Sequence, residues 1–165
     1  MTKSTAILAL TLLVLLAPAM AQDEPTIFER FPSALGAYGC TMTTGGLSYQ
    51  HWFGRIGLQV SGGALAYTSG YYDYNAQGTF QYMLYGEDFT SWFSGALYAN
   101  ALLGHRGQGS TTGEAYYSPY FFLGAGVGIE TVLLRHLALN VEFMYIGSLP
   151  LQIDFGFAAG LRYRF

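Results

Sequence analysis

The sequence has little charge, almost no lysine and a single cysteine. Charged residues make up 10% of the 165 residues, whereas soluble domains carry roughly 25%. Lys3 is the only lysine, and ten acidic residues outnumber the six arginines. This negative balance argues against a nucleic-acid partner. The one cysteine, Cys40, excludes an internal disulfide and is best interpreted as a small residue within a strand.

The sequence also lacks an apolar run long enough for a transmembrane helix. The run at 6–17 is shorter than the roughly 18 residues that a helical span needs. It follows a lysine and precedes Ala19-Met20-Ala21, an A-x-A cleavage site, so the pattern predicts a secretory signal peptide over 1–21. The polar, proline-containing residues 22–33 are interpreted as a periplasmic lead-in to one domain over 34–165.

Two-residue alternation, by contrast, is abundant. The closing stretch "LQIDFGFAAGLRYRF" (151–165) places apolar and aromatic side chains at odd positions and small, polar or charged ones at even positions. Period 2 indicates a strand, and the length exceeds the roughly 5–6 residues of an ordinary strand but suits one that crosses a bilayer. The same alternation upstream predicts eight strands in all, at about 34–42, 46–53, 56–68, 78–86, 91–103, 116–132, 137–146 and 151–165.

The connections between these strands differ in character. Those after the second, fourth and sixth strands are short, whereas 68–78 and 104–116 are longer and rich in Gly, Tyr or Ser. Bacterial barrels show this pattern, with short periplasmic turns and longer external loops. Three tyrosines of the first long loop, which are Tyr71, Tyr72 and Tyr74, are predicted to be aromatic girdle residues, a strand extension, or contacts for a surface partner.

Eight alternating strands that end on Phe165 resemble the small bacterial outer-membrane β-barrels, the class that includes OmpX and the OmpA transmembrane domain. The resemblance implies an all-β fold, an eight-stranded antiparallel up-and-down transmembrane β-barrel in the bacterial outer membrane, surrounded by outer-membrane lipid. In that class the outer-membrane assembly machinery reads a final strand that ends in Phe. The resemblance therefore implies that Leu161, Tyr163 and Phe165 form an assembly signal. It does not name a function, because one fold hosts many.

If the apolar face meets lipid, the polar face lines the lumen. An eight-stranded barrel is only wide enough to be filled by side chains, so the sequence predicts a filled lumen without an open pore. A hairpin turn centred near 148–149 would place Glu142 opposite Gly156. The arginines are expected near Glu130, because acids in a narrow lumen need partners. The predicted lumen network is Gln59, Asn100, Glu130, Asn140, Glu142, Asp154, Arg162 and Arg164.

Nothing in the sequence predicts a catalytic, cofactor or metal site. His51 and His136 are expected at the periplasmic end and His105 at the external end, so the three histidines should not cluster. His105, Ser110 and Glu114 share one Gly-rich loop, which is a poor support for a catalytic triad because catalytic groups need locked rotamers. The Gly-rich stretches lack the following helix that a phosphate loop requires. We therefore expect a non-enzyme.

Three roles remain open at this stage. The first is envelope structure or surface interaction with an unidentified partner through the loops 68–78 and 104–116. The second is a conduit for small hydrophobic solutes of the OmpW type, supported by four apolar residues expected to face inward, Met83, Trp92, Leu102 and Met144. The third is a soluble secreted, lipocalin-like barrel with an apolar cavity, which would place Arg162 and Arg164 on the outside.

Overall fold

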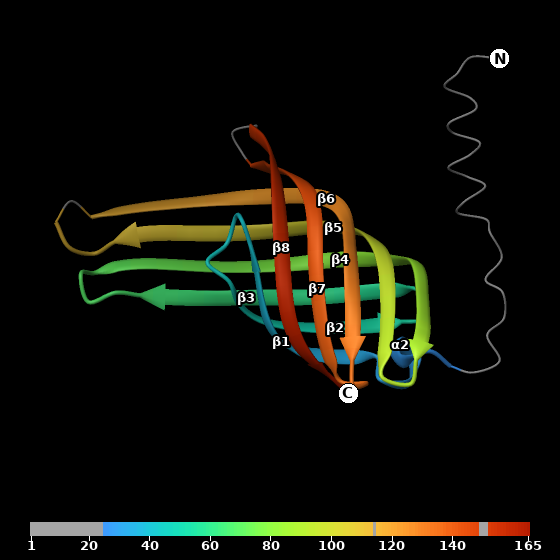
Figure 1. Ribbon diagram of the computed structural model, residues 1–165. Coiled ribbons are helices and arrows are strands. Elements are labelled where there is room, and N and C mark those ends of the chain that lie inside the picture. The colour runs from blue at the N-terminus through green and yellow to red at the C-terminus, as the bar shows by residue number, and fades with distance from the viewer. Residues whose placement is uncertain (1–24, 114, 149–151) are drawn as a thin grey trace, which may run out of the picture.

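A computed structural model describes residues 25–113, 115–148 and 152–165. Eight antiparallel strands form one closed barrel in which each strand pairs with the next and β8 pairs with β1 (Figure 1). The predicted fold class and strand count are confirmed, while the predicted signal peptide at 1–21 lies outside the described residues. The strands are β1 (Ser33–Cys40), β2 (Gly46–Phe53), β3 (Ile56–Ala66), β4 (Tyr71–Thr90), β5 (Phe93–Ser110), β6 (Tyr116–Leu133), β7 (Leu137–Ser148) and β8 (Gln152–Arg164).

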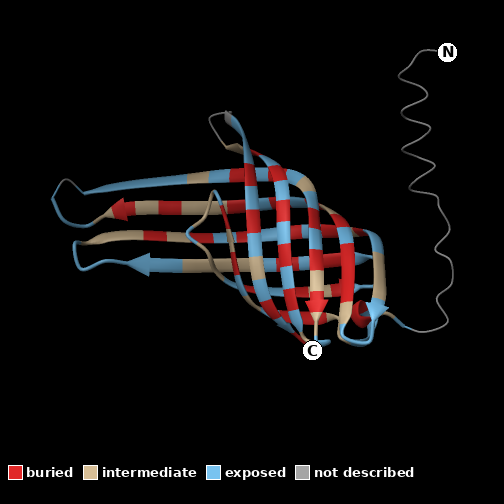
Figure 2. Ribbon diagram, in the orientation of Figure 1, coloured by how far each residue is buried: buried red, intermediate tan, exposed pale blue. Residues whose placement is uncertain are grey.

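Burial alternates along the strands, as the banding of Figure 2 shows. On β7 the odd residues from Leu137 to Tyr145 are exposed and the even ones are buried. The exposed set is apolar throughout the barrel wall, whereas the interior holds Glu130, Glu142 and two arginines. Such a wall suits lipid rather than water, because polar side chains are the ones withdrawn inside. The soluble, lipocalin-like alternative is wrong, since it required the opposite orientation.

Four strands continue beyond the ring of the barrel. β7 pairs with β6 only as far as Phe122, and β2 pairs with β3 only as far as Gly62. Beyond these points β3 to β6 still pair with one another. We call this four-stranded sheet the extension; it comprises residues 63–66, 71–75, 106–110 and 116–120 and is the long projection at the left of Figure 1.

The extension corrects the prediction that 68–78 and 104–116 are loops. Most of both segments is strand. Gly, Tyr and Ser content favours loops as a local signal, but here consecutive strands satisfy one another's backbone hydrogen bonds in register. Alternation in fact continues through this region, since Asp73, Asn75 and Gln77 are buried and their even-numbered neighbours are not.

The lead-in contains one helical turn, α2 (Ile27–Arg30), which the sequence periodicity did not predict because four residues are too few to show a period. The Thr26 backbone N–H donates to the Glu29 carboxylate over 2.9 Å, which satisfies a free donor at the start of the turn. Ile27 and Phe28 are buried. Within the described residues no helix is long and apolar enough to cross a membrane.

The β7–β8 register differs from the predicted register by two residues, because Glu142 was expected opposite Gly156. Glu142 lies opposite Ala158, and Met144 lies opposite Gly156. The face of every residue is unchanged, because the shift is even-numbered. Gly156 has Ile146 packed against the space that a Cβ would occupy, so a small residue lies beside a bulky one. Strand alternation alone does not specify which of these even-numbered registers is adopted.

Candidate functional site: the lumen and the extension

The lumen contains a fully buried ion pair. Arg164, the penultimate residue, contacts Glu130 of β6, and neither side chain has any exposure. Gln50 joins both partners: its amide nitrogen donates to Glu130 over 3.0 Å, and its oxygen accepts from Arg164 over 3.0 Å. The pair therefore has the additional hydrogen bonds that a buried charge requires, and it links β2, β6 and β8 across the interior.

The second buried acid, Glu142, is held mainly by neutral donors. The hydroxyls of Tyr38 and Tyr98 each donate to it over 2.8 Å. Asn140 donates over 3.1 Å and in turn accepts from Arg162 over 2.6 Å. Gln81 donates to the same carboxylate over 3.4 Å. Donors from four strands, β1, β4, β5 and β7, thus converge on one carboxylate, and Arg162 is connected to it through the amide of Asn140.

Most of the predicted lumen residues lie inside the barrel. Glu130, Asn140, Glu142, Arg162 and Arg164 belong to the hydrogen-bonded groups just described, and Gln59 accepts from Gln81 over 3.3 Å. The sequence analysis did not select the bridging partners, although inward alternation could have identified them: Tyr38, Gln50, Gln81 and Tyr98.

Two predicted lumen residues stand apart from this network. Asn100 faces inward and is buried, but its side-chain amide has no partner within the described residues. Asp154 is exposed, so its assignment to the buried network is corrected. It has the inward-facing alternation, but it lies near the start of β8, opposite Ile146 and close to where β7 ends.

The lead-in closes the end of the barrel at which β1 begins and β8 ends, which we call the terminal end. Phe28 packs edge-on against Trp52, with ring centroids 6.3 Å apart, and lies 4.9 Å beneath the Arg164 guanidinium. Arg164 also donates to the Phe31 carbonyl over 2.9 Å. At the rim, Arg30 pairs with Asp88 over 2.5 Å. The turn of helix therefore plugs the lumen directly below the buried ion pair.

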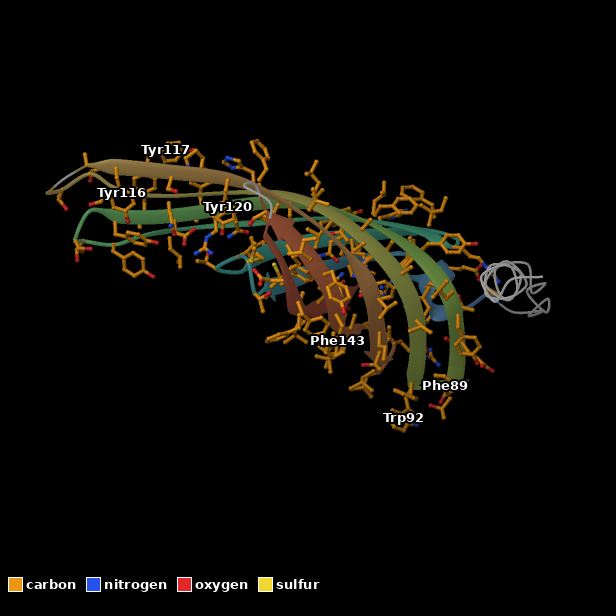
Figure 3. All side chains as sticks on the ribbon, turned by 90° about the horizontal axis from the view of Figure 1, so that it is seen from above. Phe89, Trp92, Tyr116, Tyr117, Tyr120 and Phe143 are labelled. Carbon is orange, nitrogen blue, oxygen red and sulfur yellow. The ribbon has the colours of Figure 1, made fainter. Side chains whose placement is uncertain are left out.

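The apolar residues assigned to a solute path do not line a common passage. Trp92 is 56% exposed in a turn at the terminal end, so its predicted inward position is wrong. It lies far from the tyrosines of the extension in Figure 3. Met83 packs in the cluster around the plug. Leu102 and Met144 belong to a separate buried cluster.

The extension has two chemically different faces. On the inward side Asp73 and Arg106 form a bidentate pair, with contacts of 2.5 and 3.0 Å. This carboxylate raises the pKa of Arg106 above its ordinary value. Tyr71 lies on the same side and donates to Gln108 over 3.4 Å. Tyr72 and Tyr74 lie on the outward side, so the three tyrosines predicted as one contact group are divided between two faces.

The histidines lie at both ends of the barrel. His51 contacts Ser33 over 2.8 Å, and His136 contacts the Arg164 carbonyl over 2.7 Å, both near the terminal end. His105 packs against Phe121 at the base of the extension. Ser110 lies on the opposite face of the same strand, because the two positions differ by an odd number. The described residues contain no group of three metal-ligating side chains.

A closed eight-stranded antiparallel barrel with an apolar outer wall and a polar lumen has the fold of the small outer-membrane β-barrels. Its architecture is similar to that of the N-terminal barrel domain of OprF from Pseudomonas aeruginosa, with a TM-score of 0.60 and 13% identity over 81% of this chain and 96% of that one.

Two further solved structures were also matched at lower similarity. Neisserial surface protein A has a TM-score of 0.45 and 14% identity, over 81% of this chain and 93% of that one. Ail of Yersinia pestis has a TM-score of 0.38 and 14% identity, over 82% and 95%. No protein-family model matches the chain, and neither does any curated protein sequence. These comparisons support the fold alone.

Proposed function

We propose that this protein is an integral, non-enzymatic barrel of the bacterial outer membrane that acts in envelope structure or surface contact. The observation that carries the proposal is the extension, a four-stranded sheet that continues past the ring of the barrel. With the terminal end in the periplasm, as short turns and termini are in bacterial barrels, the extension stands outside the cell. Its tips at 67–70 and 111–113 are then the most distant surfaces.

The lumen supports this role over transport. A plug that includes Phe28 closes the terminal end, and the Arg164–Glu130 pair crosses the interior above it. Separate apolar clusters, rather than a continuous passage, contain Met83 and Met144. A conduit for small hydrophobic solutes would require the plug and the Arg164–Glu130 pair to move out of the lumen. Surface contact through the extension requires no such movement.

The test compares wild type with a variant in which short turns replace the extension. Both are expressed in bacterial cells, and heat-modifiable mobility on detergent gels verifies that each barrel is folded. We expect the short variant to lose adhesion to mucin-coated surfaces if the role is contact, or to sensitise the cells to detergent if the role is envelope structure. A control variant changes the turn residues Gly54 and Arg55 at the opposite, terminal end of the barrel and should leave both adhesion and detergent sensitivity unchanged.

The outcomes separate the alternatives. Loss of adhesion in the short variant, with normal folding, supports surface contact. Unchanged adhesion and unchanged detergent sensitivity, together with solute flux through the wild-type barrel in lipid bilayers, would reject the proposal in favour of the conduit. Recovery of wild type in the soluble periplasmic fraction would reject the membrane location itself.

A further inference from the structure

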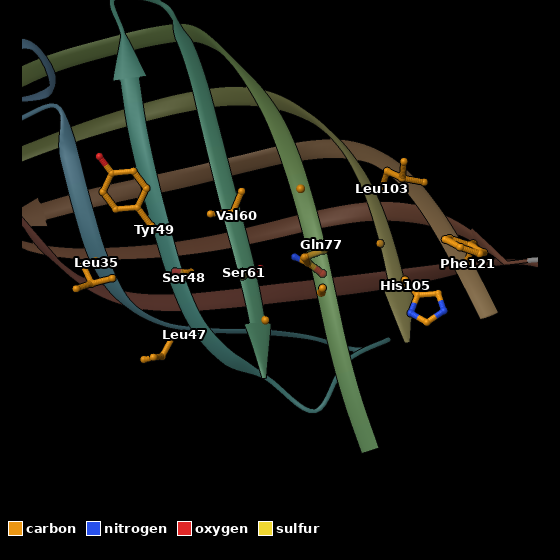
Figure 4. Close-up of a pocket in the computed structure, with 14 residues that line it drawn as sticks. Leu35, Leu47, Ser48, Tyr49, Val60, Ser61, Gln77, Leu103, His105 and Phe121 are labelled. Atoms are coloured by element: carbon orange, nitrogen blue, oxygen red, sulfur yellow. The ribbon is translucent and has the colours of Figure 1, made fainter. Parts of the chain in front are cut away.

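The outer wall of the barrel has a hollow immediately below the extension. Its volume is about 690 Å³, which lies within the range of roughly 300–1,000 Å³ typical of small-molecule sites. The floor consists of Gly62, Ala76 and Gly78 on the neighbouring strands β3 and β4. We call this hollow the bowl; Figure 4 shows residues that line it, among them Leu47, Val60, Leu103, His105 and Phe121.

The bowl results from small side chains between large ones in the same rows of the sheet. Across one row Leu47 lies opposite Gly62, Gly62 opposite Ala76, and Ala76 opposite His105. In the row below, Gly78 lies between Val60 and Leu103. These rim side chains are mostly apolar and exposed. On a wall that faces lipid, an apolar hollow accommodates a hydrocarbon chain.

A tyrosine surface stands directly above the bowl on the outward face of the extension. The Tyr74 ring lies over Gly107, and the Tyr72 ring lies over Gly109, so close that a Cβ at either glycine would lie 2.6 to 2.7 Å from atoms of the tyrosine side chain. The hydroxyls of Tyr74 and Tyr117 are 2.6 Å apart. We call Tyr72, Tyr74 and Tyr117 the platform. Tyrosine rings resting on glycines present an apolar surface together with hydroxyls that hydrogen-bond.

The absence of charged side chains on this face indicates which kind of ligand it can bind. The outward positions of the extension carry no Asp, Glu, Lys or Arg, because Asp73 and Arg106 both point to the other side and neutralise each other. The platform therefore suits an uncharged group with hydroxyls. A sugar ring fits this description, since its C–H face packs on an aromatic ring while its hydroxyls bond to phenol groups.

We propose that the bowl and the platform together hold one glycolipid molecule of the surrounding membrane. An acyl chain lies along Gly62, Ala76 and Gly78, and the first sugars of the headgroup lie on Tyr72 and Tyr74. His105 marks the boundary, since its ring packs against Phe121 of the bowl and lies 5.7 Å from the Tyr74 ring. The occupant is a lipid of the membrane because the platform continues the lipid-facing wall of the barrel upward. The inference rests on the proposed membrane location.

The experiment measures the lipid that the purified barrel retains. Wild type is reconstituted in nanodiscs of phosphatidylethanolamine and an uncharged glycosyl diacylglycerol and is then transferred to mild detergent. Native mass spectrometry measures the mass of the lipid that stays bound. We expect one retained glycolipid per barrel. The double change Tyr72→Ala and Tyr74→Ala should reduce retention roughly tenfold, because each ring contributes an aromatic packing interaction of ordinary size. The pair Tyr72→Phe and Tyr74→Phe keeps the rings and should lose less.

Matched controls test each half of the site. Tyr116→Ala removes an exposed tyrosine from the other face of the extension and should leave retention unchanged. Ala76→Leu fills the bowl and should reduce retention of the acyl chain. Ala125→Leu adds the same volume on the lipid-facing wall of β6, outside the bowl, and should have no effect.

Three results would overturn the inference. They are equal retention of phosphatidylethanolamine and glycolipid, wild-type retention in the Tyr72→Ala and Tyr74→Ala variant, and a dimer that Ala76→Leu abolishes, which would assign the bowl to a second copy of the chain. Heat-modifiable mobility is measured for every variant. If wild type itself is not a membrane-inserted barrel, the proposed function fails first, and that result is distinguishable from a folded barrel that retains no glycolipid.

Discussion

Arg164 and Glu130 form an ion pair without solvent exposure, which connects the penultimate residue of the chain to β6 across the interior of the barrel. β8 closes the ring against β1. The pair therefore fixes the interior side of the closing strand, while the backbone of the neighbouring Phe165 bonds to Ser33 in both directions, over 2.8 and 3.1 Å.

Removal of one partner of this pair should be severe. Arg164→Ala leaves the Glu130 charge buried with Gln50 as its remaining strong donor, and breaking such a pair costs about 3–5 kcal/mol. The double change Arg164→Gln and Glu130→Gln removes both charges and should cost less than Arg164→Ala. Urea unfolding in detergent, followed by heat-modifiable mobility, measures both. Equal stability of wild type and Arg164→Ala would contradict this account.

Phe28 should control the attachment of the plug without controlling the fold of the barrel. Phe28→Ala removes a buried ring between Trp52 and Arg164, a change that costs about 3–5 kcal/mol in a packed core. We expect faster proteolysis of the lead-in with an intact barrel and no conductance, because the ion pair still crosses the lumen. Arg30→Ala, which breaks a partly exposed pair worth up to about 1 kcal/mol, is the control and should change proteolysis little. Open-channel conductance in Phe28→Ala would show that the plug alone seals the lumen.

Gly36 should be essential to closure of the ring. A Cβ at this position would lie 2.1 Å from the Leu161 carbonyl oxygen of β8, so Gly36→Ala forces the closing strands apart. Gly78→Ala is a matched control, because its Cβ meets nothing within 4 Å. The folded fraction after refolding into detergent, read from gel mobility, should fall for Gly36→Ala only. A similar folded fraction for both variants would argue against a tight β1–β8 contact.

The tyrosine pair of the platform should titrate at high pH. The hydrogen bond with Tyr74 raises the pKa of Tyr117 above the usual value for tyrosine, so folding favours the protonated form. The stabilisation is complete below about pH 10, where unfolded tyrosine is still neutral, and is lost as the pH rises through the higher folded-state pKa. Tyr74→Phe should move one tyrosinate absorbance transition to lower pH. If the transitions of the remaining tyrosines keep their midpoints in Tyr74→Phe, the pairing of Tyr74 with Tyr117 is excluded.

Deletion of Phe165 should impair assembly more than stability. Its ring is exposed on the lipid-facing side, beyond Tyr163 and Leu161, which the resemblance to outer-membrane barrels implies are parts of one assembly signal. We expect the truncated chain to accumulate in the periplasm while the barrel refolds in detergent nearly as well as wild type. Cell fractionation measures the first quantity and refolding yield the second. Normal delivery of the truncated chain to the outer membrane would remove the assembly role of Phe165.

Local alternation predicted much of this architecture. Each strand position has only two sides, so the parity of Glu130, Glu142 and Arg164 was sufficient to place them together in the interior once eight strands were counted. The same odd–even pattern was insufficient for Asp154. The pattern predicts which side of the strand a residue faces, but it does not predict whether the barrel wall surrounds that position on all sides. Trp92 was misplaced for a related reason, since it lies in a turn where alternation has no meaning.

What the sequence by itself determined is the list of strands, the lipid-facing side of each and the polar character of the lumen, because all three follow from the two-residue period of an extended chain. Only the tertiary structure decided which strands extend beyond the closed ring and which register β7 and β8 adopt. It also decided that Phe28 of the lead-in packs into the end of the lumen and closes it. These features depend on contacts between residues distant in the chain, such as Phe28 with Arg164 and Gly62 with Ala76. Strand alternation carries no information about which distant residues meet.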